Sequence, residues 1–274
     1  MSKEIQLKRQ GVVVMSTTAI KDGWLDVHGV KLEVFHKGEG QPLLFLHHGE
    51  GLNPNAPFLE GLCQHFEVIA PSHPGFGHSP RPDDIDTVDD IAYLYLDLLE
   101  ALDLRDVILV GCSVGGWIAA EIATKSVERL AKVILGDPVG IKPGDRETRD
   151  IPDIYALHPE EVAKLMFHKP PVLDFSAFSD DELTVMARNR ETLTLLVWEP
   201  YMHNPKMLKR LHRVKVPTLL LRGASDGLIS QSYVEAYRDA IPGARLEVIP
   251  AAGHAPQNEQ PDAFVQAIVN FAKE

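Results

Sequence analysis

The chain has 274 residues, 45% of them hydrophobic, which suits one large domain with an insertion or two small domains. Its 39 acidic side chains exceed its 27 Lys and Arg side chains and give a net charge of -12. This charge disfavours nucleic acid and anionic membrane surfaces as partners. No apolar run approaches the roughly 18 residues of a membrane-spanning helix, so we expect no membrane span.

The N-terminal segment, Met1 to Gln10, carries Lys and Glu side chains and is not followed by the apolar stretch of a secretory signal. The two cysteines, Cys63 and Cys112, lie far apart and have neither metal-type nor redox-type spacing. A disulfide framework and a zinc site are therefore not expected. Together these features predict a soluble, cytoplasmic protein.

Six short segments have the composition of buried parallel strands, because they are rich in leucine or β-branched residues and end in loops containing Gly, Pro or His. They are Leu43–Leu46, Glu67–Ala70, Val107–Val110, Lys132–Leu135, Thr218–Leu221 and Leu246–Ile249. Helix-like patterns alternate with these segments at both ends of the chain. The fold class predicted is therefore α/β, with a mostly parallel central sheet flanked by helices.

A helix is expected after Thr87, where Thr87 to Asp90 resembles a capping box and apolar residues follow at helical spacing from Ile91 to Leu102. The acidic residues before and within its first turn could suggest a cation site. Acidic side chains at a helix N-terminus are favourable without any metal, and we prefer that interpretation. The residues concerned are Asp83, Asp84, Asp86, Asp89 and Asp90.

From Val139 to Arg213 the strand pattern disappears, and helices are expected after His158-Pro159, after Ser179 to Glu182, and after Asn204-Pro205. Proline-containing turns bound this stretch, as expected where a chain leaves a sheet and rejoins it. The prediction is an inserted α-helical cap. The predicted divisions are 1–138 for the first part of the core, 139–213 for the cap and 214–274 for the second part of the core.

The segment Gly111-Cys112-Ser113-Val114-Gly115 places a Gly-x-Ser-x-Gly motif between a predicted buried strand and an apolar helix. In that context the serine hydroxyl is exposed at the carboxyl end of the sheet, and the flanking glycines relieve crowding. The helix dipole favours negative charge near Ser113. Ser113 is therefore a candidate nucleophile rather than a helix cap.

A serine nucleophile needs a base, and the base needs a third group that holds its tautomer. Asp226 lies just beyond the predicted strand ending at Leu221, and His254 lies just beyond the one ending at Ile249. The chain order is thus Ser, Asp, His, with all three at the carboxyl ends of predicted strands.

This order resembles that of the α/β-hydrolase family over nearly the whole chain, in its serine-nucleophile branch with a helical cap. The resemblance implies that Ser113 is the nucleophile, His254 the general base and then acid, and Asp226 the orienting carboxylate. Some relatives use an acid at the position of Asp137, but Pro138 follows it here and the Asp226 loop matches the usual pattern better. No cofactor and no metal are implied.

His47-His48 follows the first predicted strand and resembles the family's His-Gly loop, which supplies an N–H to the oxyanion hole. No second ligand cluster supports a metal site there. Taking His48-Gly49 as the motif makes Glu50 the donor, whereas counting from the strand start makes it Gly49. Val114, directly after the nucleophile, is the expected second donor. His73, in a Pro-Gly-rich loop, is expected to be a hydrogen-bonding loop residue.

The predicted cap is rich in aromatic residues and methionine, which suits a small-molecule ester or acyl substrate with an apolar portion. Most of these side chains are expected to form the cap's own core. The densest cluster runs from Trp198 to His203, and within it Trp198 and Tyr201 are the candidate substrate-binding residues.

The resulting prediction is a serine hydrolase that cleaves carboxylic esters or related acyl compounds through an acyl-enzyme. Enzymes of this fold with an aspartate nucleophile are excluded by Ser113. Carbon–carbon hydrolases of ring-cleavage products are the nearest alternative, although they often carry Trp where this chain has Ala255. A ligand receptor of the same fold that does not turn its ligand over is a third interpretation. The oligomeric state, a homodimer included, is left open.

Overall fold

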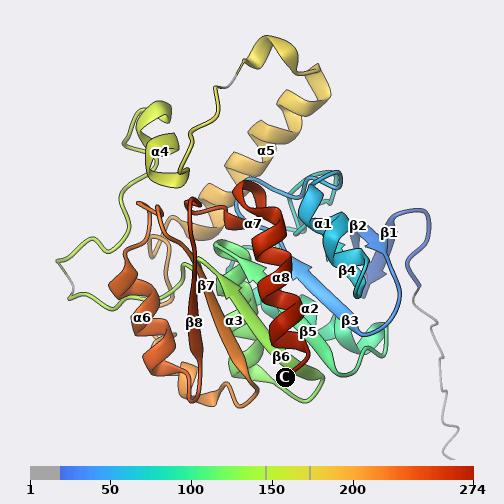
Figure 1. Ribbon diagram of the computed structural model, residues 1–274. Coiled ribbons are helices and arrows are strands. Elements are labelled where there is room, and N and C mark those ends of the chain that lie inside the picture. The colour runs from blue at the N-terminus through green and yellow to red at the C-terminus, as the bar shows by residue number, and fades with distance from the viewer. Residues whose placement is uncertain (1–18, 146, 173) are drawn as a thin grey trace, which may run out of the picture.

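The computed structural model describes residues 19–145, 147–172 and 174–274, so the prediction about Met1 to Gln10 lies outside the described residues. Its centre is an eight-stranded sheet with the strand order β1-β2-β4-β3-β5-β6-β7-β8 (Figure 1). The strands are β1 (Trp24–Val27), β2 (Val30–Lys37), β3 (Pro42–Leu46), β4 (Glu67–Pro71), β5 (Val107–Cys112), β6 (Leu130–Gly136), β7 (Thr218–Gly223) and β8 (Arg245–Ile249).

Strands β3 to β8 pair in parallel, whereas β1 and β2 form an antiparallel extension at one side. All six predicted strands are confirmed, and with them the predicted fold class. The pair β1 and β2 was not predicted. The interpretation of Leu246–Ile249 as a buried strand is wrong, because β8 is the last strand of the sheet and most of its residues are partly or fully exposed.

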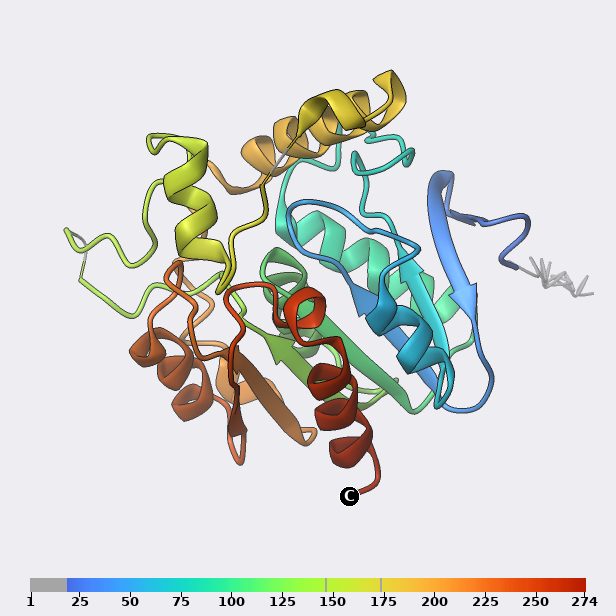
Figure 2. The same ribbon diagram turned by 45° about the horizontal axis from the view of Figure 1, so that its top comes forward.

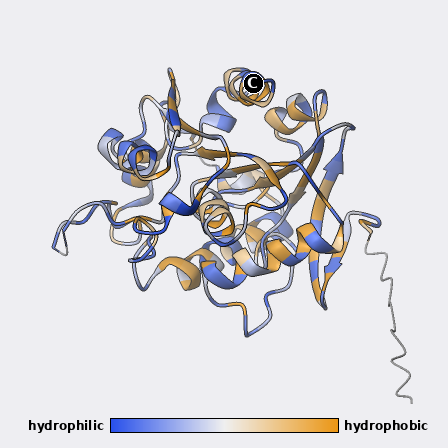
Figure 3. Cartoon of the chain, turned by 90° about the horizontal axis from the view of Figure 1, so that it is seen from below, coloured by the Kyte–Doolittle hydropathy of each residue, from blue (hydrophilic) through white to orange (hydrophobic). Residues whose placement is uncertain are grey.

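Two hydrophobic clusters lie on opposite faces of the sheet, because successive side chains of a strand point to opposite sides. Leu44 and Leu46 of β3 face the helices α2 (Val88–Ala101), α3 (Val114–Lys125) and α6 (Gln231–Ala240). Leu43 and Phe45 face α1 (Pro57–Cys63) and α8 (Pro261–Ala272), with the short α7 (Pro256–Glu259) before α8. In Figure 3 the interior strands are mainly in hydrophobic colours, whereas the helices mix both kinds.

The start of α2 confirms the predicted capping box, since the Thr87 side chain accepts from Asp90 N–H and the Asp90 carboxylate accepts from Thr87 N–H. Asp89 in the same turn pairs with Lys125 of α3 at 2.6 Å. These two acidic residues are therefore used by the helix cap and by an ion pair.

The segment between β6 and β7 contains α4 (Pro159–Met166), the 3-10 turn η1 (Phe175–Ala177), α5 (Asp180–Val197) and the 3-10 turn η2 (Leu211–Arg213). Figure 2 shows α4 and α5 above the carboxyl edge of the sheet. The prediction of a helix after Asn204-Pro205 is wrong. There the chain makes consecutive turns with i→i+3 bonds, and Met207 and Leu211 are buried against the core, so tertiary contacts override the local pattern.

Helix α5 is fastened to the core by polar side chains on its buried face. Asn189 donates to the carbonyl of Glu50 at 2.8 Å and accepts from Gly77 N–H at 2.9 Å. Thr192 donates to the carbonyl of Gly75 at 2.9 Å. The helix therefore touches the loops after β3 and β4. In the described part of the chain, no helix is both long and apolar enough to cross a lipid bilayer.

Helix α3 approaches the sheet so closely that Gly115 has no room for a side chain: a Cβ there would lie 2.2 Å from the carbonyl oxygen of Leu46. Backbone atoms cannot give way as a flexible side chain can. We therefore expect Gly115→Ala to lower the free energy of unfolding by about 3 kcal/mol, measured by urea denaturation.

Gly29→Ala is the matched control, because no atom of residues 19–145, 147–172 or 174–274 lies within 4 Å of the added Cβ. Only the cost of its positive φ remains there, about 1 kcal/mol. Equal destabilisation by the two substitutions would contradict the close helix–sheet approach.

Candidate active site

Ser113 lies between β5 and α3 with φ 54° and ψ -117°, a backbone conformation that L residues rarely adopt. A Cβ on Gly111 would lie 2.2 Å from the carbonyl oxygen of Gly115, so this turn closes only with glycine at position 111. The sharp turn between a buried strand and a helix holds Ser113 at the carboxyl edge of the sheet, as its sequence context predicts.

The structure brings the three predicted side chains together from three loops. His254 Nε2 lies 2.8 Å from Ser113 Oγ, and His254 Nδ1 lies 2.8 Å from Asp226 Oδ2. Asp226 Oδ1 accepts from the N–H groups of Leu228 and Ile229 at 2.7 and 3.1 Å. Serine hydroxyl, imidazole and carboxylate thus form one continuous hydrogen-bonded series.

Asp226 is almost fully buried, yet the environment keeps it ionised. Burial alone would raise its pKa, but the His254 imidazole and the hydrogen bonds to the carboxylate outweigh burial, and the pKa of Asp226 is lowered from its usual value. A buried anion beside Nδ1 favours the tautomer that carries its proton there, which leaves Nε2 able to accept the hydroxyl proton of Ser113.

Helix α4 holds the loops of both Asp226 and His254 through backbone groups at its C-terminal end. His254 N–H donates to the carbonyl of Met166 at 2.6 Å, and Gly227 N–H donates to the carbonyl of Leu165 at 2.9 Å. Sequence reasoning missed these contacts, because a backbone carbonyl carries no residue-specific signal.

Glu259 of α7 links the loop of His254 to the segment that follows α4. Its carboxylate accepts from the N–H groups of Gly253, His168 and Lys169 at 2.6, 3.1 and 3.0 Å. We expect Glu259→Ala to lower kcat by about tenfold, because the loop of His254 loses its attachment to the segment after α4. Steady-state kinetics with an ester substrate measures this loss.

Glu235→Ala, on the surface helix α6, is the control for removing a carboxylate, and it should leave kcat unchanged. A normal kcat for Glu259→Ala would show that α4 alone positions the His254 loop.

The two alternative oxyanion-hole donors beside Val114, which are Glu50 and Gly49, differ in what their N–H groups contact. The N–H of Glu50 donates to His48 Nδ1 at 3.2 Å and is therefore engaged, and the Glu50 side chain is 55% exposed. Within the described residues, the N–H groups of Gly49 and Val114 have no protein acceptor. Of the two alternatives, the geometry favours Gly49 as the partner of Val114. Leu193 of α5 packs directly on Gly49.

Two buried histidines, His47 and His73, and the half-buried His48 lie in and beside this loop. His73 Nε2 donates to the carbonyl of His47 at 3.0 Å, and its Nδ1 accepts from Tyr95 OH at 2.5 Å. His47 Nε2 in turn accepts from His73 N–H at 3.0 Å. Burial lowers the pKa of His48 and of His47, and lowers the pKa of His73 to about 3. These histidines are thus neutral hydrogen-bonding groups.

A neutral buried histidine makes stability depend on pH. Between the pKa of folded His73, about 3, and its ordinary value of 6.5, the unfolded chain binds a proton that the folded chain does not. The stabilising effect is therefore complete above the ordinary value and decreases as the pH falls below it. From pH 7 to pH 5 we expect a loss of about 2 kcal/mol from His73, measured by urea denaturation.

His73→Gln should make this pH dependence shallower, whereas His65→Gln, at an exposed position, is the control. An unchanged slope in His73→Gln would show that His73 does not contribute.

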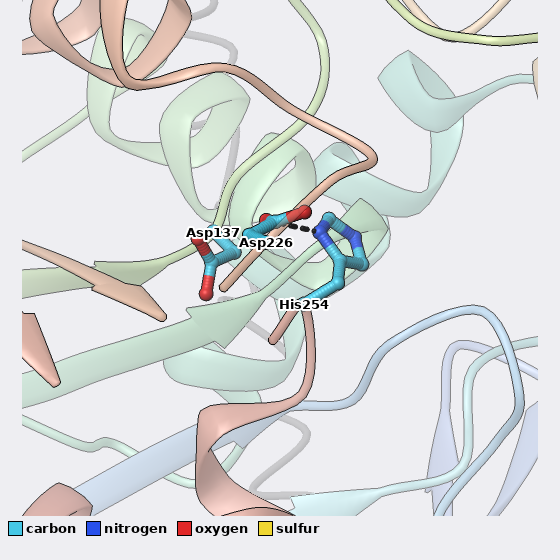
Figure 4. A group of neighbouring side chains, drawn as sticks. All are labelled: Asp137, Asp226 and His254. Carbon is cyan, nitrogen blue, oxygen red and sulfur yellow. Dashed lines mark hydrogen bonds and ion pairs between the residues drawn. The ribbon is translucent and has the colours of Figure 1, made fainter. Parts of the chain in front are cut away.

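Asp137, the alternative acid, follows β6 and lies beside Asp226 and His254 (Figure 4). Each of the three offers a ligand atom, and these atoms lie within 4.8 Å of one another. However, His254 Nδ1 and Asp226 Oδ2 already share a hydrogen bond, and Asp226 Oδ1 accepts two amide N–H groups. A cation here would have to break the His254–Asp226 contact, so the group is better described as hydrogen-bonded than as a metal site.

The two candidate substrate-binding residues contact other residues of the segment between β6 and β7. Trp198 is 54% exposed and packs edge-to-face on Tyr155 at 5.7 Å. The hydroxyl of Tyr201 accepts from Ile154 N–H at 3.0 Å and donates to the carbonyl of Pro152 at 2.8 Å. Neither is hydrogen-bonded to Ser113 or His254 within the described residues, so a substrate contact stays a prediction.

Known proteins with similar sequences or structures have this fold. A family model described as an alpha/beta hydrolase family matches residues 43–267. The chain is 26% identical over 277 residues to 2-hydroxymuconate semialdehyde hydrolase of Pseudomonas sp. (strain CF600), covering 90% of this chain and 92% of that one.

Two solved structures are similar in fold. A bacterial membrane phospholipase A has a TM-score of 0.75 and 23% identity, with 92% of this chain and 86% of that one covered. An esterase from Exiguobacterium antarcticum has a TM-score of 0.69 and 18% identity, with 90% and 97% covered. With the family model matching most of its length, the chain belongs to the alpha/beta hydrolase family.

Proposed function

We propose that this hydrolase cleaves carboxylic esters through an acyl-enzyme formed on Ser113. The observation that carries the proposal is the series Ser113 Oγ, His254 and Asp226, joined by two contacts of 2.8 Å. The strained backbone of Ser113 supports it, as do the N–H groups of Gly49 and Val114, which have no acceptor in the part of the chain that the structure describes.

In the first step, His254 Nε2 removes the proton of Ser113 as Oγ attacks the ester carbonyl carbon, and Asp226 stabilises the resulting imidazolium. The negative charge that develops on the carbonyl oxygen is stabilised by the N–H groups of Val114 and Gly49. His254 then donates its proton to the alcohol that leaves. In the second step, His254 takes a proton from a water molecule as its oxygen attacks the acyl carbonyl carbon, and then gives that proton to Ser113 Oγ as the bond to the acyl group breaks and the acid leaves.

The substrate class we propose is a small-molecule ester with an apolar portion. Leu193 of α5 packs on Gly49, so the segment between β6 and β7 presents an apolar side chain beside the proposed oxyanion hole. Residues 139–213 act in this proposal as a cap, with Trp198 and Tyr201 as candidate contacts at its outer part.

Carbon–carbon hydrolysis is a second candidate, because 2-hydroxymuconate semialdehyde hydrolase is a relative over nearly the whole chain. Against it, the residue after His254 is the small, buried Ala255, where such enzymes often carry Trp.

A panel of p-nitrophenyl esters of increasing acyl length, assayed beside 2-hydroxymuconate semialdehyde, separates the candidates. Sustained release of p-nitrophenol, with faster turnover of an ester than of the semialdehyde, is expected. Faster turnover of the semialdehyde would favour carbon–carbon cleavage. A single stoichiometric burst would contradict turnover and favour a ligand receptor.

A further inference from the structure

Asp137 is a second buried carboxyl group beside Asp226 and His254 (Figure 4). It follows β6 at φ 40° and is fully buried. Its Oδ2 accepts from Gly223 N–H at 3.0 Å, whereas no N–H or O–H donor of the described residues meets its Oδ1. A buried carboxylate oxygen without a donor is costly. A proton on Oδ1 removes that cost, because it turns the oxygen into a donor.

The charges around Asp137 lead to the same protonation state. The titratable and charged groups that face it are Asp226, His254, Arg222 of β7 and Cys112 of β5. The Arg222 guanidinium donates to backbone carbonyls within residues 224–229 and not to Asp137. Arg222 therefore favours an anion at Asp137 only through space, and the neighbouring carboxylate of Asp226 opposes that anion more strongly.

Burial, and then the charge of Asp226, raise the pKa of Asp137 well above its usual value. Two carboxyl groups that share a buried site do not both ionise, because the second ionisation would place like charges close together in a medium that screens them weakly.

We propose that Asp137 is a positioning residue: it stays protonated and donates a hydrogen bond from Oδ1 to the carboxylate of Asp226, which keeps Asp226 ionised and directed at His254. This proposal rests on the proposed function, in which His254 is the base. The proton of Asp137 is not transferred in the reaction. Asp226 then accepts from the imidazole, from two backbone amides and from this carboxyl group.

The first experiment detects the proton directly, by infrared spectroscopy of the wild-type protein and Asp137→Asn. We expect a carboxylic-acid C=O stretching band at neutral pH that Asp137→Asn removes. Absence of that band from a folded wild-type protein would overturn the proposal. This measurement does not depend on turnover, so a protein that shows the band but hydrolyses no ester would contradict only the proposed function.

The second experiment compares two substitutions by steady-state kinetics across pH. In Asp137→Asn, the amide oxygen can accept from Gly223 N–H and the amide N–H₂ can donate to Asp226. We expect its kcat to stay within about threefold of the wild type, with the acidic limb of kcat/KM unmoved, because one neutral donor replaces another. A shift of that limb to lower pH by about one unit would show that an anion had been removed, and would overturn the proposal.

Asp137→Leu has a similar shape but no donor. We expect it to lower kcat by about tenfold with KM little changed, because it acts through Asp226 rather than on the substrate. Thr218→Val, which removes a fully buried hydroxyl from β7, is the matched control and should leave the kcat pH profile unchanged. A wild-type kcat for Asp137→Leu would overturn the positioning role. If Asp137→Leu does not fold, the infrared band and the pH profile of Asp137→Asn still test the proposal.

Discussion

Ser113→Ala is expected to lower kcat for ester hydrolysis by about 10⁵-fold to 10⁶-fold, because no other group replaces a lost nucleophile. Ser113 Oγ is hydrogen-bonded to His254 at 2.8 Å and makes no cap hydrogen bond to α3. The substitution therefore removes the reacting atom without removing a helix cap. Hydrolysis of p-nitrophenyl esters by the purified variant measures the loss, and thermal unfolding shows whether the fold is retained.

Ser126→Ala is the matched control for Ser113→Ala, because Ser126 lies at the other end of the same helix and its hydroxyl accepts a hydrogen bond from Glu128 N–H. It should keep normal kinetics. Residual hydrolysis by Ser113→Ala near the wild-type rate, in a preparation free of other esterases, would exclude Ser113 as the nucleophile.

Asp226→Asn is expected to lower kcat by about 10⁴-fold while KM changes little. The amide that replaces the carboxylate cannot stabilise the imidazolium of His254, and its N–H₂ group favours the wrong imidazole tautomer. Asp226 is buried and bonded to His254 Nδ1, so the change acts directly on the base. Single-turnover kinetics of acylation isolates the affected step.

Asp239→Asn, which removes an exposed carboxylate paired with Arg238, is the control for Asp226→Asn and should leave kcat unchanged. The opposite pattern, in which Asp137→Asn abolishes acylation and Asp226→Asn does not, would transfer the role of the acid to Asp137.

The parallel strands β3 to β7 were predictable because each contains an apolar run that is buried on both faces of the sheet. The antiparallel pair β1 and β2 was not, because its burial alternates and its stretch contains charged and polar residues. The edge position of β8 also escaped prediction, since a strand's place in a sheet depends on its partners. The prediction of a helix after Pro205 failed for a similar reason, because the core residues that Met207 and Leu211 contact determine their burial.

In the candidate site, too, some residues could be named from the sequence and others depended on tertiary contacts. Ser113, Asp226 and His254 could be named from the sequence, because each directly follows a predicted strand and the carboxyl ends of parallel strands meet at one edge of the sheet. The choice between Glu50 and Gly49 depended on a hydrogen bond from Glu50 N–H to the ring of His48, which no pattern encodes. The contact of Leu193 with Gly49 depended on which face of α5 meets the core.

The sequence by itself determined the α/β-hydrolase fold class, and it predicted which strand ends carry the serine of the Gly-x-Ser-x-Gly turn, the acid and the base. These features are local, because the apolar pattern and the turn glycines act over a few residues. Only the tertiary structure decided the distances of 2.8 Å around His254, the fastening of its loop by α4 and Glu259, and the burial of Asp137 beside Asp226. Those features arise where segments distant in the chain meet, and protonation there is set by the burial and charges that such packing creates.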